Sequence, residues 1–167
     1  MVSAGKGRLR RDPGDDWVIA PDGRRFWGRF GAAGLLLADA GFERVLLQLR
    51  VGWSHFGGTW GIPGGALHEG EDAAAGALRE AHEEAGVPSS QVQILDQRTL
   101  DLGFWSYTTV FGVALAPVEA RCTDAESVAL EWVAADEVTQ RPLHPGFAES
   151  WQQWRAELDS RRSPRRV

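Results

Sequence analysis

Cysteine is almost absent from this sequence. Cys122 is the only one, so a disulfide within the chain is excluded, and this usage is typical of a protein in a reducing cytoplasm. No apolar run approaches the roughly 18 residues that a membrane-spanning helix needs. The start of the sequence is charged and lacks the apolar centre of a secretory signal. We therefore expect a cytoplasmic protein with no membrane partner.

Basic residues are scarce in the middle of the chain. The net charge is −5, but eight of the 18 basic residues lie in residues 1–12 and 160–167, which leaves 10 basic against 22 acidic residues in 13–159. Such an acidic body repels the phosphates of nucleic acids, so we expect no stable nucleic-acid partner. A divalent cation is the simplest partner for this surplus of carboxylates.

The alternation of apolar and polar residues predicts one domain with a mixed β-sheet, one helix near its middle and another at its end. We expect a flexible basic segment over residues 1–15, a single domain over 16–159 and a disordered basic tail over 160–167. The motif Pro21-Asp22-Gly23 predicts the turn of an N-terminal hairpin. Further strands are expected at residues 32–38, 43–50, 91–102, 104–116 and 128–134.

Two helices follow from the periodicity. Gly86 is suited to end a helix that begins near Asp72. A second helix over residues 147–158 carries an apolar stripe that indicates core packing rather than a ligand site. The residues of this stripe are Phe147, Trp151, Trp154 and Leu158.

Three glutamates of the first helix, Glu80, Glu83 and Glu84, lie on one narrow face. Like charges four residues apart cost about 0.2–0.5 kcal/mol, and carboxylates in the last turn oppose the helix dipole by about 0.3–1 kcal/mol each. The same face continues through small residues, whereas Leu78 and Ala81 are expected on the opposite, packed side. This arrangement predicts a cation site with room for a ligand.

The ligand types indicate which cation this is. No two histidines have the HxxxH spacing, and carboxylates without cysteine or paired histidine favour Mg²⁺ or Mn²⁺ over zinc. Mg²⁺ is commonly bound by a few carboxylates together with the phosphates of a substrate. The residues therefore predict metal-assisted chemistry on a phosphate ester or anhydride.

The stretch "GALHEGEDAAAGALREAHEEAGV", residues 65–87, resembles the Nudix box, G-x5-E-x7-R-E-U-x-E-E-x-G-U, where U is apolar. One U position holds Ala81, which is smaller than the usual residue and implies looser packing. The resemblance extends over about residues 25–158 and implies an α/β/α sandwich with a mixed β-sheet. The matching positions are Gly65, Glu71, Arg79, Glu80, Glu83, Glu84, Gly86 and Val87.

The resemblance implies a role for each residue of the box. Glu83 and Glu84 look like direct Mg²⁺ ligands, with Mn²⁺ as a substitute, and Glu80 looks like a further ligand or the base for the attacking water. The carbonyl of Gly64 is expected near the metal. The remaining two, Glu71 and Arg79, resemble the ion pair that fixes the loop against the helix.

Many members of this family use one more acid from a loop ahead of a later strand. Glu126 is the predicted residue, six positions before Trp132. Asp124 and Glu119 are the alternatives.

The loop over residues 50–60 lies between a strand and the box, where a substrate could bind. Its candidates are Arg50 for a phosphate and Trp53, His55, Phe56 and Trp60 for stacking on a base. Trp105 and Tyr107, at the start of a later strand, are further candidates. Buried aromatic residues usually belong to the core, which is the competing interpretation of each.

The resemblance implies hydrolysis of a nucleoside diphosphate linked to another group. We expect a MutT-like pyrophosphohydrolase of (d)NTPs, with a small-molecule nucleotide as partner. The alternatives are a hydrolase of ADP-ribose, NADH or dinucleoside polyphosphates, and a Nudix domain that senses a nucleotide without cleaving it. An isopentenyl diphosphate isomerase would need a cysteine in the site, and Cys122 lies outside the box. A homodimer formed through the N-terminal hairpin is a further hypothesis.

Overall fold

The computed structural model describes residues 12–162. Most of the expected basic segment at the start, and residues 163–167 of the expected tail, lie outside this range. Within it, strands, α-helices and short 3-10 helices alternate along the chain. The strands are β1 (Trp17–Ile19), β2 (Arg25–Trp27), β3 (Ala32–Ala38), β4 (Arg44–Arg50), β5 (Trp60–Gly61), β6 (Gly64–Ala66), β7 (Val92–Asp101), β8 (Ser106–Ala114) and β9 (Ser127–Ala134). The helices are α1 (Ala73–Ala85), η1 (Ser89–Gln91), η2 (Val138–Gln140) and α2 (Pro145–Arg161).

Seven of these strands form one mixed sheet in the order β5-β4-β3-β8-β7, with β6 paired to β3 and β9 paired to β4. The pair β3–β8 is parallel along the whole of β3, and the other pairs are antiparallel. Strand β3 pairs with β6 at its start and meets β4 only at its end, where Ala38 lies opposite Val45. Along one edge of β3, the sheet is therefore continued by β6 at the start of the strand and by β4 at its end.

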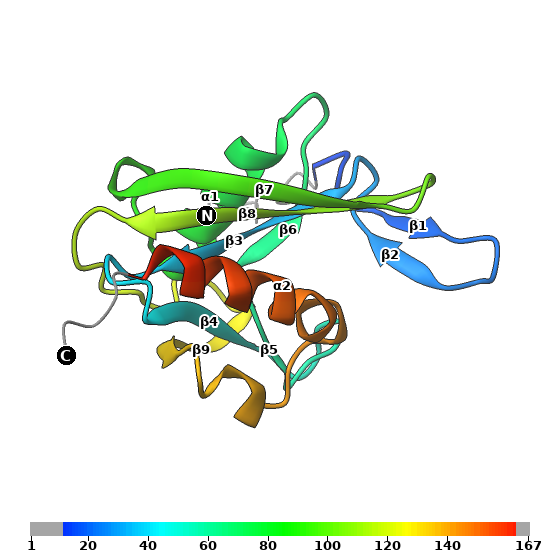
Figure 1. Ribbon diagram of the computed structural model, residues 1–167. Helices are drawn as coiled ribbons and strands as arrows, with labels where there is room; N and C mark the ends of the chain where they lie inside the picture. The colour runs from blue at the N-terminus through cyan, green and yellow to red at the C-terminus, as the bar shows by residue number, and fades with distance from the viewer. Residues whose placement is uncertain (1–11, 163–167) are drawn as a thin grey trace, which may run out of the picture.

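The two α-helices cover opposite faces of this sheet (Figure 1). Leu36 of β3 packs with the apolar residues of α2, whereas Leu35 and Leu37 pack with the alanines of α1. Successive side chains of a strand point to opposite faces, so a sheet covered on both sides needs apolar residues at every position. This explains why all seven residues of β3 are buried. The expectation of an α/β/α sandwich with a mixed sheet is confirmed.

The C-terminal helix α2 begins with Pro145 at its first turn and ends at Arg161. The predicted stripe is confirmed as core, because Phe147, Trp151, Trp154 and Leu158 are all buried. The helix is longer than expected at its C-terminal end, and Ser160 and Arg161, which were expected in the tail, are helical. An ion pair between Arg161 and Glu157, one turn earlier, stabilises this last turn of the helix.

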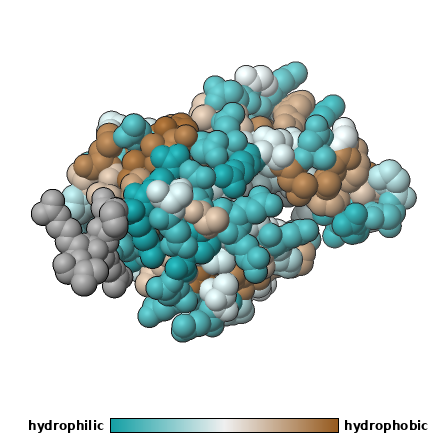
Figure 2. Space-filling view, in the orientation of Figure 1, coloured by the Kyte–Doolittle hydropathy of each residue, from teal (hydrophilic) through white to brown (hydrophobic). Residues whose placement is uncertain are grey.

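The predicted N-terminal hairpin is present as β1 and β2, and Gly23 in its turn has a φ of 86°. It forms a separate two-stranded sheet at one end of the molecule (Figure 1). The ring of Phe26 packs against those of Phe104 and Trp105 from the β7–β8 turn. Apolar residues gather where this hairpin meets the rest of the molecule (Figure 2).

Strand β6 lies within the stretch "IPGGALHEGE", whose residue pattern indicated only that no helix would form there. Its glycines lie close to β3, and a Cβ on Gly64 would stand 2.5 Å from the carbonyl oxygen of Ala33. Within residues 12–162, no helix is long and apolar enough to cross a membrane.

Candidate metal and catalytic site

The helix α1 begins and ends where its sequence indicates. Asp72 is the N-cap and accepts a hydrogen bond from the backbone N–H of Ala75 at 2.8 Å. Gly86 adopts the left-handed conformation with a φ of 66° and ends the helix. The three glutamates therefore lie in its last two turns, as predicted.

The face that carries these glutamates is not separate from the packed face. Ala77 and Ala81, which were expected on different sides, are both fully buried, and Glu84, two turns after Ala77 on the same face, has 2% of its surface exposed. The sheet covers the middle of this face because the alanines allow α1 to approach it closely. Glu84 therefore points into the protein, whereas Glu83 keeps 53% of its side chain exposed.

Glu84 is held by two hydrogen bonds. Its Oε2 atom accepts one from Nε2 of Gln48 on β4 and one from the backbone N–H of Gly64 on β6, both at 3.1 Å. The carboxylate thus lies between β4 and β6, where β3 changes its pairing partner from one to the other. The backbone carbonyl of Gly64, which was predicted to approach a metal, belongs to the same residue that donates to Glu84.

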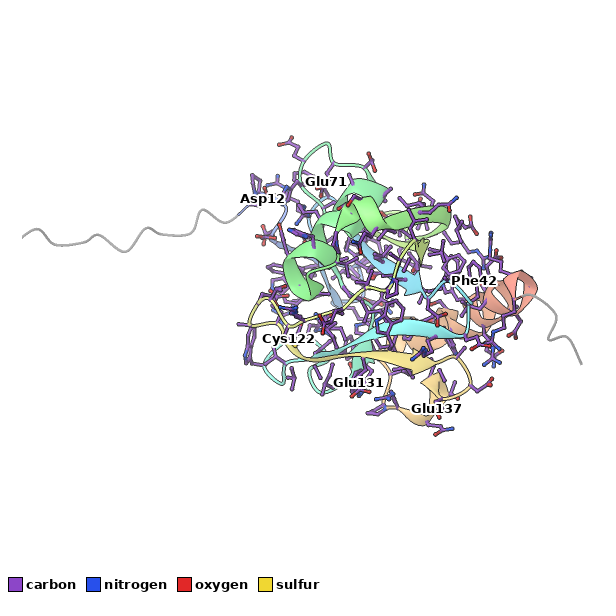
Figure 3. All side chains as sticks on the ribbon, turned by 90° about the vertical axis from the view of Figure 1, so that its left-hand side faces the viewer. Asp12, Phe42, Glu71, Cys122, Glu131 and Glu137 are labelled. Carbon is purple, nitrogen blue, oxygen red and sulfur yellow. The ribbon has the colours of Figure 1, made fainter. Side chains whose placement is uncertain are left out.

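The guanidinium of Arg79 contacts the other acids of the box. It donates to both carboxylate oxygens of Glu71, at 2.9 and 3.0 Å, and to the carbonyl oxygen of Ala66. It also contacts Glu80 at 2.8 Å and Glu83 at 3.2 Å. The predicted ion pair is therefore formed with bidentate geometry. Figure 3 shows Glu71 beside one end of α1 and Cys122 on the loop beside the other.

Glu80 packs directly on the first glycine of the box. A Cβ on Gly65 would stand 2.7 Å from the Cδ atom of Glu80, so no other residue fits without displacing this carboxylate. The structure thereby explains the glycine at this position.

The loop acids lie beside Glu84. Carboxylate oxygens of Glu84, Asp124 and Glu126 are all within 4.8 Å of one another. Both the predicted residue and its first alternative therefore reach the site, and the backbone N–H of Glu126 donates to Asp124 at 3.0 Å. Glu119 lies apart from this group, exposed and paired with Arg121.

Backbone contacts hold this loop against the end of α1. The N–H of Arg121 donates to the carbonyl of Ala85, and the N–H of Thr123 donates to that of Glu84. The hydroxyl of Thr123 also donates to the carbonyl of Glu83. These bonds satisfy carbonyls that the end of a helix leaves free, and they bring the following acids to the carboxylates of α1.

Burial and crowding raise the pKa values of two of these acids. Desolvation raises the pKa of Glu80 to about 7; Arg79 acts against this rise, and Glu83 and Glu126 add to it. Desolvation, together with Glu80, Glu126 and Asp124, raises the pKa of Glu84 well above its usual range. A bound cation would offset both the burial and the repulsion.

The donor set is suited to a hard divalent cation. The three converging side chains offer only carboxylate oxygens, which are the ligands that Mg²⁺ and Mn²⁺ prefer, and no sulfur or imidazole is among them. Glu80 and Glu83 lie on the same helix face and add further oxygens nearby. The residues present therefore fit the predicted metal.

The predicted substrate residues of the β4–β5 loop differ from one another in what they contact and in how exposed they are. Arg50 donates to the carbonyl of His55 at 3.1 Å, and the imidazole of His55 packs against Trp17 and Phe56. Trp53 is 71% exposed.

Trp60 is a correction to the substrate candidates. It is buried in the core on the α2 face of the sheet, with Arg141 over its ring at 4.6 Å. This face is opposite to the one that α1 covers, so Trp60 does not join the acids.

Tyr107 lies near both the acids and Arg50. Its hydroxyl oxygen packs over Gly34, where a Cβ would stand 2.2 Å away. Desolvation raises the pKa of Tyr107; Glu84 and Glu80 add to the rise, and Arg50 opposes it. The ring of Trp105 lies 6.2 Å from that of Tyr107. The structure thus keeps Tyr107 as a candidate for contact with a substrate.

Sequence reasoning missed Gln48, Ser127 and His144. Gln48 joins Glu84 to Ser127 through its amide nitrogen, and its only signal is a lone polar residue in the apolar strand "RVLLQLR". His144 caps α2 through Nδ1 and lies beside Phe56. Its position directly before a proline at a helix start was the available signal.

Comparisons with known proteins agree with this geometry. A family model described as the NUDIX domain matches residues 28–154. The chain is 44% identical over 154 residues to the Mycobacterium tuberculosis protein named "Putative 8-oxo-dGTP diphosphatase 3", and the match covers 87% of this chain and 70% of that protein.

Two further proteins are similar over most of the chain. A Bifidobacterium longum "Nucleoside triphosphate pyrophosphatase/Nudix hydrolase fusion protein" is 41% identical over 154 residues, which are 88% of this chain and 32% of the fusion. The crystal structure of a Nudix hydrolase from M. smegmatis, RenU, superposes with a TM-score of 0.79 at 43% identity. That superposition covers 92% of this chain and all of the other.

Proposed function

The chain belongs to the Nudix family of hydrolases, and from this premise we propose that it is an Mg²⁺-dependent, MutT-like pyrophosphohydrolase of nucleoside triphosphates. The observation that carries the proposal is the meeting of Glu84 with Asp124 and Glu126, next to Glu80. Burial raises the pKa values of Glu80 and Glu84, so their charged forms are costly to the metal-free fold and are accounted for by a cation. The name of the M. tuberculosis relative, "Putative 8-oxo-dGTP diphosphatase 3", supports a nucleoside triphosphate as substrate.

Each acid has a role in this proposal. Glu83, Glu84, Glu126 and the carbonyl of Gly64 hold Mg²⁺, with Asp124 beside them, and Mn²⁺ can replace it. When bound, Mg²⁺ polarises the pyrophosphate oxygens and stabilises the charge that develops on them. Arg79 and Glu71 keep the loop 65–71 against α1, so that the glutamates stay aligned.

Glu80 is the proposed base for the attacking water. A base is most effective when its pKa lies near the working pH, and burial raises the pKa of Glu80 to about 7. Arg79 holds one of its oxygens at 2.8 Å, which fixes the orientation of the carboxylate.

The nucleotide is proposed to lie between the acids and the β4–β5 loop. Arg50 supplies positive charge to a phosphate, and Trp53, His55 and Tyr107 offer aromatic surface to the base. Trp60 has no part in this proposal, because its ring is buried on the other face of the sheet.

The test is the release of phosphate and pyrophosphate from a panel of nucleotides, with Mg²⁺ and with EDTA. The panel holds canonical and oxidised (d)NTPs, ADP-ribose, NADH and dinucleoside polyphosphates. We expect metal-dependent turnover of a nucleoside triphosphate, reduced by about two or more orders of magnitude in Glu83→Gln and Glu84→Gln. Glu149→Gln, an exposed acid on α2, is the matched control and should leave turnover unchanged.

Other outcomes would redirect the assignment. Turnover of ADP-ribose, NADH or a dinucleoside polyphosphate alone would keep the enzyme and reject the triphosphate. Tight binding of one nucleotide without turnover would reject hydrolysis of this panel and favour a sensing domain.

A further inference from the structure

Gln48 is an unusual residue for its position. It lies in β4 among apolar neighbours, and only 1% of its surface is exposed. Both of its hydrogen bonds use the amide nitrogen, which donates to Oε2 of Glu84 at 3.1 Å and to the hydroxyl oxygen of Ser127 at 2.6 Å. Reversing the amide would place its oxygen against the carboxylate oxygen of Glu84, so these partners define its orientation.

The remaining acceptor of this side chain has no partner. Within residues 12–162, Oε1 of Gln48 is the one buried side-chain nitrogen or oxygen that lacks a hydrogen bond. A buried acceptor without a partner destabilises a fold, and an apolar residue of similar length would avoid that cost. Stability alone therefore does not account for glutamine here.

The two partners of Gln48 come from the two segments that carry the site. Glu84 lies near the end of α1, and Ser127 directly follows Glu126 at the start of β9. The pairing of β4 with β9 is irregular at this point, with a shift between Leu49 and Arg50. Beyond the shift, the backbone N–H of Val51 donates to the carbonyl of Glu126 at 3.0 Å, and the amide of Gln48 adds a side-chain link across the irregularity.

We propose that Gln48 is a positioning residue that holds the carboxylate of Glu84 and the start of β9 together, so that Glu84, Asp124 and Glu126 are already arranged to receive a divalent cation. The inference rests on the proposed function only in that these carboxylates bind the cation. One amide group provides two donors in a fixed geometry, one for each segment. Residues that orient metal ligands in this way typically change metal affinity by about 10–100-fold when replaced.

The test is Mn²⁺ binding to the purified protein, together with the melting temperature of the metal-free form. Gln48→Met keeps the length of the side chain and removes both donors. We expect it to weaken Mn²⁺ binding by about tenfold or more and to leave the metal-free melting temperature nearly unchanged, since the unpaired oxygen is also removed. Gln93→Met, the same change at an exposed position of β7, is the control and should bind as the unaltered protein does.

Ser127 provides a second and milder variant. Ser127→Ala keeps the bond between Gln48 and Glu84 and breaks only the link to β9, so we expect a several-fold loss of Mn²⁺ affinity. Ser127→Thr retains the hydroxyl and should restore most of it. In both Gln48→Met and Ser127→Ala, the Mg²⁺ concentration for half-maximal turnover should rise, whereas the KM for nucleotide at saturating Mg²⁺ should stay the same.

Three results would overturn the inference. Wild-type affinity for Mn²⁺ in Gln48→Met is the first. A fall in melting temperature of Gln48→Met, combined with unchanged binding by Ser127→Ala, would assign Gln48 a structural role only. Absence of Mn²⁺ binding by the unaltered protein would reject the proposed function itself and the inference with it.

Discussion

The helices α1 and α2 cover opposite faces of one sheet but bury different residues. The buried face of α2 consists of Phe147, Trp151, Trp154 and Leu158. The buried face of α1 consists of one glycine, three alanines and the carboxylate of Glu84. The apolar area that α1 removes from water is therefore small, and it also carries a buried charge.

This difference indicates that the α2 layer mainly stabilises the fold and that the α1 layer mainly forms the site. The large apolar side chains of α2 stabilise the fold, since burying each of them contributes about 1.5–3 kcal/mol. The α1 layer carries carboxylates in the last turns of the helix, where the helix dipole disfavours negative charge. Burial also removes the water that would stabilise that charge. Each of the following substitutions tests whether stability and activity are separated in this way.

The largest effect is expected in the α2 layer. Trp154 is 1% exposed, packs against Phe111 and carries Arg98 over its ring. Trp154→Ala should lower the free energy of unfolding by about 3–5 kcal/mol, as measured by urea denaturation. Below its melting temperature, the variant should keep its turnover per folded molecule. Trp53→Ala, at a 71% exposed position, is the control and should change stability by less than about 0.5 kcal/mol.

The second-largest effect should be a loss of turnover without a loss of stability. Glu84→Gln should reduce turnover by about a hundredfold or more, equivalent to about 2.7 kcal/mol, while the metal-free protein becomes no less stable. The amide oxygen can still accept from Gln48 and Gly64, and the buried charge is removed. Turnover at saturating Mg²⁺ and thermal denaturation in EDTA measure the two quantities. A less stable variant with full turnover would contradict this separation of stability from activity.

The third effect concerns the N-terminus of α2 and its dependence on pH. Desolvation, with Arg50 and His55, lowers the pKa of His144 to about 4. The folded state therefore favours the neutral ring, whose Nδ1 accepts from the N–H of Gly146. As the pH falls below about 6.5, the unfolded chain binds the proton first, so the contribution to stability is full above that value and is lost towards pH 4.

Between pH 7 and pH 5 this residue should cost the protein about 1–2 kcal/mol of stability. His144→Asn retains an N-cap acceptor and does not titrate, so its stability should fall less over the same range. Urea denaturation of both proteins at the two pH values measures the difference. Equal losses in the two proteins would show that His144 is not the titrating group.

The smallest effect is expected at the C-terminal end of α1. Thr123→Val removes the hydroxyl that donates to the carbonyl of Glu83 and keeps the shape of the side chain. We expect a loss of about 0.5–1.5 kcal/mol in stability and a several-fold rise in the Mg²⁺ concentration for half-maximal turnover. Thr99→Val, on β7 and away from the acids, serves as the comparison. An unchanged Mg²⁺ requirement would mean that the loop acids are placed without this contact.

Much of the fold could be predicted from local patterns. The bounds of β3, the N-cap at Asp72 and the end of α1 at Gly86 agree with the sequence, because each depends on a few neighbouring residues. Strand β6 and the full length of α2 could not be predicted in this way. The glycines of β6 are extended only because β3 lies beside them, and this pairing joins residues about 30 positions apart.

By itself, the sequence determined the acidic helix and its spacing of Glu80, Glu83 and Glu84, which follow from positions within a short segment and the period of a helix. The pair of Glu71 and Arg79 was implied by the resemblance to the Nudix box, and the structure supplied its bidentate geometry. Only the tertiary structure decided that Glu84 is buried, that Trp60 belongs to the core and that Asp124 and Glu126 meet Glu84 about 40 residues later in the chain. The link through Gln48 belongs to the same group. These outcomes depend on which strands pair and which face each helix covers, and such contacts between distant segments leave no period in the sequence.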